Sequence, residues 1–317
     1  MSNVTGTATK WNCPNFVGEL FLIGQYATPF LNMVGGLTGG KQYAAFDFPT
    51  AQPWALDGAS QPNITETASL TAPDPRTYVR SLVTNTVQIF QRSVTVSYAK
   101  LSTTAVIGAD TTTDKAMLGN QPVQNELDFQ IQAHLRQISL DAEFTFLQGA
   151  YVQATTSATA ARSRGMLTAT TTNAINANSA PLSKALIDQL LRTMAAAGSP
   201  FINPVIFVNA YQKQMISNIY GYAPESRNIG GVNIQQIETD FTMLGVIWAP
   251  QMPTNQLLIA EMSVCAPVFC PVPGKGFIFY EELAKTGAGE RGQLYGQLGL
   301  DHGPEIYHGK ITSLATA

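Results

Sequence analysis

The sequence predicts an α+β protein in which one long helix separates an extended hairpin-like excursion from an α/β unit. Three observations support this prediction. Apolar residues between positions 121 and 149 recur at three- and four-residue spacing, residues 87–98 alternate as a strand does, and short helical and strand patterns alternate after position 182. The chain has 317 residues, and this length accommodates two domains of about 150 residues or one larger unit.

Residues 1–40 form the first predicted element, an extended arm. Gly and Pro punctuate this segment, and it ends in a glycine-rich run at 35–40. Because these residues interrupt regular structure, we expect only one short helix, near residues 18–26. Terminal segments are ordered only where something holds them, so a neighbouring subunit is a candidate partner for the arm.

Residues 42–100 have segregated charges. All charges up to position 75 are acidic and all charges after it are basic: Asp47, Asp57, Glu66 and Asp74 precede Arg76, Arg80, Arg92 and Lys100. The strand alternation of the second half changes phase near residues 90–93, which predicts a β-bulge there. We predict a hairpin-like loop with one acidic and one basic arm, although eight charges also segregate by chance.

Residues 121–149 give the clearest helical pattern, with Pro122 in the first turn and Gly149 at the C-terminal cap. A helix of about 25 residues would be about 37 Å long. A second apolar row predicts that the helix contacts partners on more than one side; it comprises Phe129, Ala133, Leu140, Phe144 and Leu147.

A Thr/Ala/Asn-rich stretch at 153–180 indicates a linker or a β-excursion, and it marks a boundary. Beyond it, Ser183 is placed to cap a helix that runs to position 197, and a second helix is expected at 211–220. Strands are expected at 205–209, 232–237, 244–248, 257–261, 264–269, 277–281 and 305–314.

The composition excludes several classes of protein. Charged residues make up 12% of the chain, about half the usual share. The net charge is −3 and the hydrophobic fraction is 45%, so neither a disordered chain nor a basic nucleic-acid binder fits. A surface with so little charge suits a protein that other subunits cover. No signal peptide or membrane span is expected from the sequence.

Two phosphate-loop patterns in the sequence are weak. The run GGLTGGK at 35–41 is followed by Gln42 instead of Ser or Thr, and an apolar aromatic segment stands where a helix should begin. We interpret this run as a glycine hinge. The GxGxxG pattern at 287–292 lies too near the C-terminus for a dinucleotide-binding unit, and we interpret it as a loop.

No catalytic, cofactor or metal site is predicted. His134, His302 and His308 lack metal-ligand spacing, so structural roles are favoured, although the segment 301–308 retains a possible metal-binding composition. Cys13, Cys265 and Cys270 form no close CxxC pair and indicate neither a disulfide framework nor a zinc site.

Several segments, taken in order along the chain, resemble the major capsid proteins of tailed bacteriophages, and in particular the major head proteins of siphovirus-like phages. This fold also occurs in encapsulin shells. The segments are TPF at 28–30, VTVS at 94–97, EFTFLQG at 143–149, RSRGML at 162–167 and LDHGPEIYHGKI at 300–311.

The resemblance implies a domain plan for the chain. It assigns residues 1–40 to an N-arm, 41–100 to an extended β-hairpin called the E-loop, and 101–181 to a P-domain with a spine helix at about 122–149. Residues 182–270 would form an α/β A-domain, and residues 271–317 would return to complete the P-domain sheet. The E-loop would lie across a neighbouring subunit, with assembly contacts from Asp47, Asp57, Glu66, Arg76, Arg80 and Arg92.

The resemblance also implies a function without catalysis or cofactors. Copies would associate as hexamers and pentamers into an icosahedral virion shell, assembled in the cytoplasm of a bacterial host around double-stranded DNA. Portal, scaffold and decoration proteins would be further partners. DNA contact would be weak and non-specific, with Arg162 and Arg164 as inner-surface candidates. No lysine lies between Lys41 and Lys100, so a lysine cross-link at the loop tip is not expected.

Two alternatives remain at this point. The first is an encapsulin-like compartment that has the same shell fold but carries an enzyme as cargo. The second is a soluble α/β enzyme that uses residues around His302 and His308.

Overall fold

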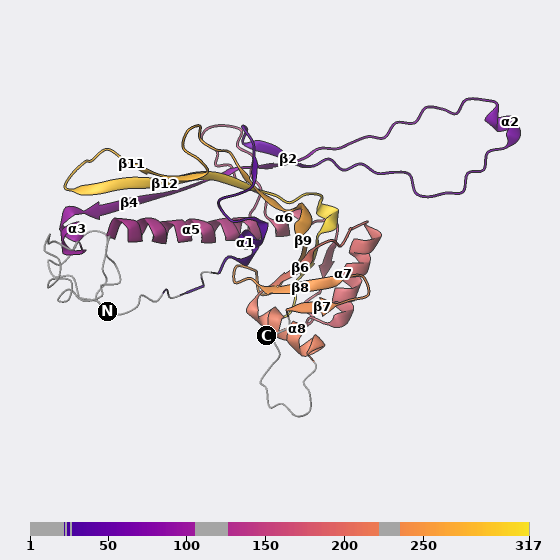
Figure 1. Cartoon of the computed structure of the whole chain (residues 1–317). Helices are drawn as coiled ribbons and strands as arrows, with labels where there is room; N and C mark the ends of the chain where they lie inside the picture. Colours follow the sequence, from indigo (N-terminus) through magenta and orange to yellow (C-terminus); the bar gives the residue numbers. More distant parts are fainter. Residues whose placement is uncertain (1–21, 23, 26, 105–125, 222–234, 317) are drawn as a thin grey trace, which may run out of the picture.

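The computed structural model of the chain describes residues 22, 24, 25, 27–104, 126–221 and 235–316. It contains two main sheets, one long helix beneath the first sheet, and a loop that extends far from the rest of the chain (Figure 1). Helix and strand are mixed as the sequence predicts. The Pro122 turn and Cys13 lie outside the described residues, as does most of the short helix expected at 18–26, of which only residues 22, 24 and 25 are described and are not helical.

The first sheet has five strands and lies along helix α5 (Glu126–Gln148). Its longest strand, β12 (Gly289–Asp301), pairs antiparallel along one edge with β4 (Gln88–Ser97). The other edge pairs with β10 (Ala266–Phe269) and then β11 (Ile278–Glu282). Strand β1 (Lys41–Gln42) adds to β10 in parallel.

Strand β12 begins inside the segment that the sequence analysis interpreted as a GxGxxG loop, so that prediction was wrong over residues 289–292. The glycines of β12 make room for neighbouring side chains. A Cβ atom on Gly292 would meet the Tyr280 ring of β11, and one on Gly296 would lie 2.7 Å from Ile278. Glycine therefore occurs in this strand where side chains of the neighbouring strand lie over its backbone. Close approach of this kind is one of the known uses of glycine in sheets.

The β-bulge predicted at residues 90–93 is absent, because β4 pairs with β12 without interruption from Gln88 to Ser97. The change of phase instead occurs at Val87, between β3 (Val83–Thr86) and β4. Val87 donates its backbone N–H to Phe46 and is buried, and Phe90, Val94 and Val96 then face the core. Strand β4 continues into helix α3 (Tyr98–Thr104).

The second sheet has six strands in the order β5-β13-β9-β6-β8-β7. The strands are β5 (Ala174–Asn176), β6 (Pro204–Val208), β7 (Gln236–Glu238), β8 (Met243–Trp248), β9 (Leu257–Glu261) and β13 (Gly309–Thr312). Helices α7 (Lys184–Ala196) and α8 (Ala210–Tyr220) pack against it. Ser183 caps α7 as predicted, and its Oγ accepts from the Leu186 N–H.

The C-terminal strand β13 joins this second sheet through β9 and β5. This corrects the expectation that everything after residue 270 completes the sheet beside the long helix. Strand β5 lies in the segment 153–180, for which the sequence left a linker and a β-excursion open, and it fits the second of these. Short turns complete the chain: helix α6 (Met166–Ala169) and the 3₁₀ turns η1 (Met262–Val264) and η2 (Glu305–Tyr307).

The two sheets share one core that contains the end of α5. Ile138, Ala142 and Phe146 are fully buried there, as the helical periodicity predicts. The second apolar row is only partly covered, because Phe129 and Phe144 stay exposed. At 1.5 Å per residue, the 23 residues of α5 span about 35 Å.

Helix α1 (Pro29–Val34) connects the arm to the core through Glu143 of α5. Glu143 is fully buried, and its carboxylate accepts the backbone N–H groups of Phe30 (3.0 Å) and Leu31 (2.6 Å). Burial raises the pKa of Glu143 to about 7, against the opposing effect of these two hydrogen bonds. The carboxylate thus satisfies two donors that α1 cannot satisfy itself.

Replacing Glu143 with Gln should flatten the pH dependence of stability. Because the folded pKa of about 7 lies above the ordinary 4.5, the contribution of this group to stability is full below pH 4.5 and is lost as pH rises through about 7. At about 1.4 kcal/mol per pKa unit, the wild-type loss is on the order of 3 kcal/mol. Urea unfolding of the unassembled protein across this pH range measures the loss of unfolding free energy.

The exposed Glu282→Gln variant is the matched control for this prediction, because it removes a carboxylate of the same type from the surface. The control should keep the wild-type slope of unfolding free energy against pH. Equal slopes for Glu143→Gln and the wild type would contradict the assignment of this slope to Glu143.

Candidate functional site at the extended loop and its root

The most unusual surface of the chain is a loop that leaves the body between β2 (Asp47–Ala51) and β3. Every residue from Gln52 to Leu82 is exposed. Its far end carries the one-turn helix α2 (Glu66–Ser69), which Thr65 caps through a hydrogen bond from the Ala68 N–H (Figure 1). The predicted excursion therefore exists, but its two arms pair as strands only at the base.

The loop exposes many large apolar side chains. They are Trp54, Leu56, Ile64, Leu70, Tyr78, Val79 and Leu82, with exposures from 53% to 84%. Trp54 and Tyr78 contact each other edge to face, at 6.2 Å between ring centroids. Large contiguous apolar surfaces mark sites of protein contact, so this loop is the first candidate functional surface.

The loop contains four of the six residues predicted to act in assembly. Asp57 and Arg76 form an ion pair between the two arms, as the charge segregation suggested. Both side chains are mostly exposed, so the pair contributes little to stability. Glu66 lies in α2 and Arg80 lies near the base. Neither has an ion-pair partner among the residues that the structure describes.

The other two predicted residues contact the body of the same chain. Asp47 accepts a hydrogen bond from Gln153 Nε2 at 2.8 Å. Arg92 pairs with Asp141 of α5 at 2.5 Å and so joins β4 to the helix beneath it. The charge pattern suggested that Arg92 would meet the acidic arm, but the register of β4 with β12 places it over α5 instead.

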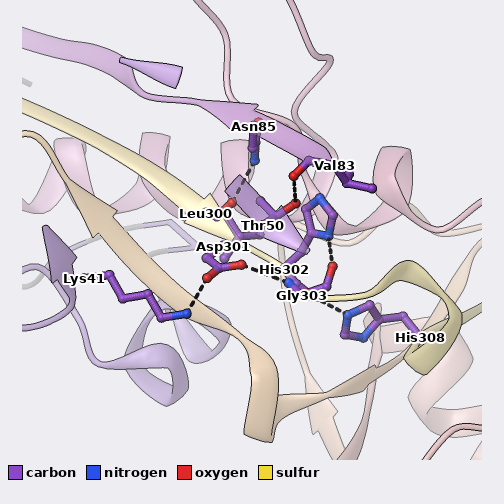
Figure 2. Close-up of polar contacts among 9 residues, drawn as sticks. All are labelled: Lys41, Thr50, Val83, Asn85, Leu300, Asp301, His302, Gly303 and His308. Atoms are coloured by element: carbon purple, nitrogen blue, oxygen red, sulfur yellow. Dashed lines mark hydrogen bonds and ion pairs between the residues drawn. The ribbon is translucent and has the colours of Figure 1, made fainter. Parts of the chain in front are cut away.

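Asn85 of β3 anchors the root of the loop. Its side chain is fully buried, and Nδ2 donates to the Leu300 carbonyl at 2.7 Å (Figure 2). Nδ2 also donates to the Arg164 carbonyl and to Ser163 Oγ, while Oδ1 accepts from the Arg164 N–H at 2.8 Å. One asparagine therefore joins the loop, β12 and the RSRG segment. The role of Asn85 was not predicted, because no local pattern in the sequence marks its hydrogen-bond partners.

Asp301 and Lys41 form a second connection at the root. Asp301 is buried, pairs with Lys41 Nζ at 2.5 Å, and accepts the Gly303 N–H at 3.0 Å (Figure 2). The glycine-rich run before Lys41 thus follows a helix and precedes a strand, which is the reverse of a phosphate loop. The rejection of that motif is confirmed.

His302 and His308 are bound to the backbone. His308 Nε2 donates to the His302 carbonyl at 2.6 Å, and its Nδ1 accepts the Glu261 N–H at 3.1 Å. Burial lowers the pKa of His308 to about 4, so the ring is neutral at pH 7. His302 Nδ1 donates to the Gly303 carbonyl at 2.8 Å (Figure 2). Nothing in this pair resembles an exposed acid–base couple.

Within the described residues, no cluster of His, Cys, Asp and Glu is arranged to hold a metal ion. Burial also raises the pKa of the Cys265 thiol, which makes it a poor nucleophile. None of the described helices has the length and the apolar composition to cross a bilayer.

A pocket of about 680 Å³ lies at the root of the loop. The loop strands contribute Ala51, Pro53 and Val83, and the opposite wall contains Arg164, His302 and Glu305. The Arg164 guanidinium stacks on the Tyr151 ring at 4.4 Å. We name this feature the root pocket.

Comparison with known proteins places these observations in a family. The sequence model of the SU10 major capsid protein family matches residues 3–315 of the chain. No curated protein sequence matches it.

Solved structures share the fold at low sequence identity. The chain is similar to the Cyanophage A-1(L) capsid protein, with a TM-score of 0.62, 11% identity and 96% of each chain covered. It is similar to the capsid protein of a native GTA particle, with a TM-score of 0.62, 12% identity and the same coverage. The SrpI encapsulin of Synechococcus elongatus PCC 7942 gives a TM-score of 0.55 and 8% identity, over 96% of this chain and 93% of that chain.

Proposed function

The chain belongs to the SU10 major capsid protein family, and from this premise we propose that its exposed loop lies across a neighbouring copy in a shell of hexamers and pentamers around double-stranded DNA. Membership of the family makes the chain a structural protein of the virion capsid that associates with itself and is not an enzyme. The tailed-phage capsid fold predicted from the sequence is confirmed at the level of the fold.

The exposed loop is the single observation that carries the proposal. An isolated copy would leave seven large apolar side chains of residues 52–82 in water. Full burial of one such side chain is worth roughly 1.5–3 kcal/mol, so covering all of them offers on the order of 10 kcal/mol before the costs of association. A partner surface is the physical means by which this free energy is recovered, and in a shell that partner is another copy.

The same comparison supports a proposed domain plan for the chain. We propose that residues 52–82 act as the E-loop, α5 as the spine of the P-domain, and the six-stranded sheet with α7 and α8 as the A-domain near the capsomer axes. The glycine-rich run at 35–40 and the segment 153–180 would absorb the differences between hexamers and pentamers. Of the six predicted assembly residues, Glu66 and Arg80 remain free for a neighbour, whereas Asp57 and Arg76 shape the loop itself.

We also propose further partners for the shell. Portal, scaffold and decoration proteins would join the shell, assembled in a bacterial cytoplasm. With a net charge of −3, DNA contact would be weak and independent of base sequence.

Particles purified from infected or expressing cells test the proposed content of the shell. We expect hollow isometric particles by negative-stain electron microscopy and, in infected cells, DNA that resists added nuclease. A packaged enzyme in place of DNA would favour the compartment alternative. A monodisperse small species at all concentrations in light scattering would contradict shell formation.

A further inference from the structure

The root pocket contains a polar atom and a charged group for which the described part of the chain provides no hydrogen-bond or ion-pair partner. His302 is 1% exposed and uses Nδ1 as a donor to Gly303, so Nε2 of the neutral ring is an acceptor. That acceptor has no hydrogen-bond partner in the described part of the chain. A buried acceptor without a partner is unfavourable, which makes the pocket a place where an incoming donor is favoured.

Arg164 gives the pocket an uncommitted positive charge. Its guanidinium stacks on Tyr151 and has no carboxylate partner among the residues described. Glu305, the pocket's carboxylate, is already occupied, because Thr171 and Thr172 donate to both of its oxygens. The pocket therefore presents the Arg164 cation and the His302 acceptor beside a carboxylate whose oxygens are already hydrogen-bonded, with apolar walls from Ala51, Pro53 and Val83.

The tip of the loop carries side chains that are complementary to the groups of the root pocket. Leu70 is 84% exposed, the highest value among the exposed large apolar side chains that the structure describes. Glu66 and Asp74 stand four positions before and after it, and neither has an ion-pair partner in the described ranges. Thr67 and Thr71 supply exposed hydroxyl donors between them.

Resting on the proposed function, we propose that the loop tip of one copy, residues 66–74, docks in the root pocket of the next copy. Leu70 enters the apolar part of the pocket, a tip hydroxyl donates to His302 Nε2, and a tip carboxylate pairs with Arg164. The pocket's 680 Å³ lies within the range of about 300–1,000 Å³ that proteins use to bury drug-sized groups, which leaves room for the Leu70 side chain.

The contact joins two different surfaces, a tip and a root, and is therefore heterologous. A repeated heterologous contact closes into a ring when its rotation closes. Figure 1 places α2 at the opposite end of the loop from β2, so a tip does not reach its own root. Each copy then gives one tip and receives one, which is the arrangement that a capsomer ring needs.

A disulfide cross-link tests the contact directly. In the full chain, Leu70→Cys is combined with Thr168→Cys, because Thr168 is exposed and lines the pocket. Oxidised particles should give a ladder of covalent multimers on a denaturing gel without reductant. The matched control combines Leu70→Cys with Ala196→Cys on α7, which is also exposed but lies outside the pocket. The control and each single variant should give no ladder.

Arg164→Ala gives a second, independent measurement. It should raise the protein concentration needed for assembly about tenfold, the effect of losing one charge-assisted hydrogen bond. Arg162→Ala removes an exposed arginine two positions away that does not line the pocket, and it should change that concentration less than about twofold.

The outcomes separate this inference from the proposed function. Intact particles that show no ladder above the control, or equal effects of Arg164→Ala and Arg162→Ala, would overturn tip-to-root docking and leave the shell function standing. If the wild-type protein forms no particles at all, the shell function itself fails.

Discussion

Replacing residues 54–80 with an Asn-Gly turn is expected to give a folded protein that no longer assembles. The loop leaves and returns at one point, because Pro53 accepts hydrogen bonds from both the N–H (3.1 Å) and the Oγ (3.3 Å) of Ser81. A two-residue turn of this composition closes a hairpin between such positions. The truncation removes only exposed residues and keeps the Asn85 anchor.

The expected magnitude is large for assembly and small for folding. The truncated chain should unfold within a few degrees of the wild-type monomer, because none of the removed side chains is buried in its core. Assembly should fall below detection, because six of the seven large exposed apolar side chains of the loop have been removed. Thermal unfolding and light scattering on the same samples measure the two effects.

A variant that keeps the full loop length shows whether assembly needs the apolar side chains of the loop or only its shape. Trp54, Leu56, Leu70 and Val79 are changed to Ser, which keeps the chain length and the Asp57–Arg76 pair. We expect this variant to fail in assembly as well. Normal particles from the truncated chain would show that the loop is not the assembly surface, and normal particles from the serine variant would show that its apolar side chains are not needed.

The sequence predicted the elements whose signals are local. Ser183 marks the start of α7 because capping depends on a hydrogen bond three residues away. The apolar period of α5 likewise appears within one helix, and Ile138, Ala142 and Phe146 lie in the core as expected. The strand at 257–261 is recovered with its full length, because its continuous apolar run is buried on both faces.

The predictions that failed depend on neighbours distant in the sequence. Strand β12 looked like a broken loop because its glycines reflect the side chains of β11 and of Phe48, which lie over it. Arg92 was assigned to the charged loop because its partner, Asp141, is 49 positions away on α5. The root pocket could not be predicted for the same reason, since its walls come from five separate segments.

Gly149 shows how a correct prediction can have a different physical cause. We expected Gly149 to cap the helix, a position where glycine often has a positive φ, and Gly149 does end α5, donating its N–H to the Thr145 carbonyl at 2.8 Å. Its φ is not among the positive values of the described residues. Glycine is instead required by close approach, because Gly165 donates its N–H to the Gly149 carbonyl at 2.9 Å and the two backbones lie against each other.

Substituting Gly149 with Ala is therefore expected to prevent folding at 37 °C. The new Cβ would lie 2.5 Å from the Ser163 carbonyl oxygen and still closer to the Thr145 carbonyl oxygen. Both are backbone atoms at the point where the end of α5 lies against residues 163–165, so neither yields as a flexible side chain would. Overpacking costs typically about 1–3 kcal/mol even where side chains adjust, and a clash between backbones exceeds that range within a total stability of about 5–15 kcal/mol.

Gly165→Ala should have the same effect, because its Cβ would lie 2.5 Å from the Gly149 nitrogen. Gly287→Ala is the matched control, since no atom lies within 4 Å of its new methyl group and its φ is not in the left-handed region. Soluble yield and urea unfolding should separate the first two variants from the third. Because the two glycines meet each other, the double variant should be little worse than either single one, whereas additive losses would mean that the two sites do not share one contact.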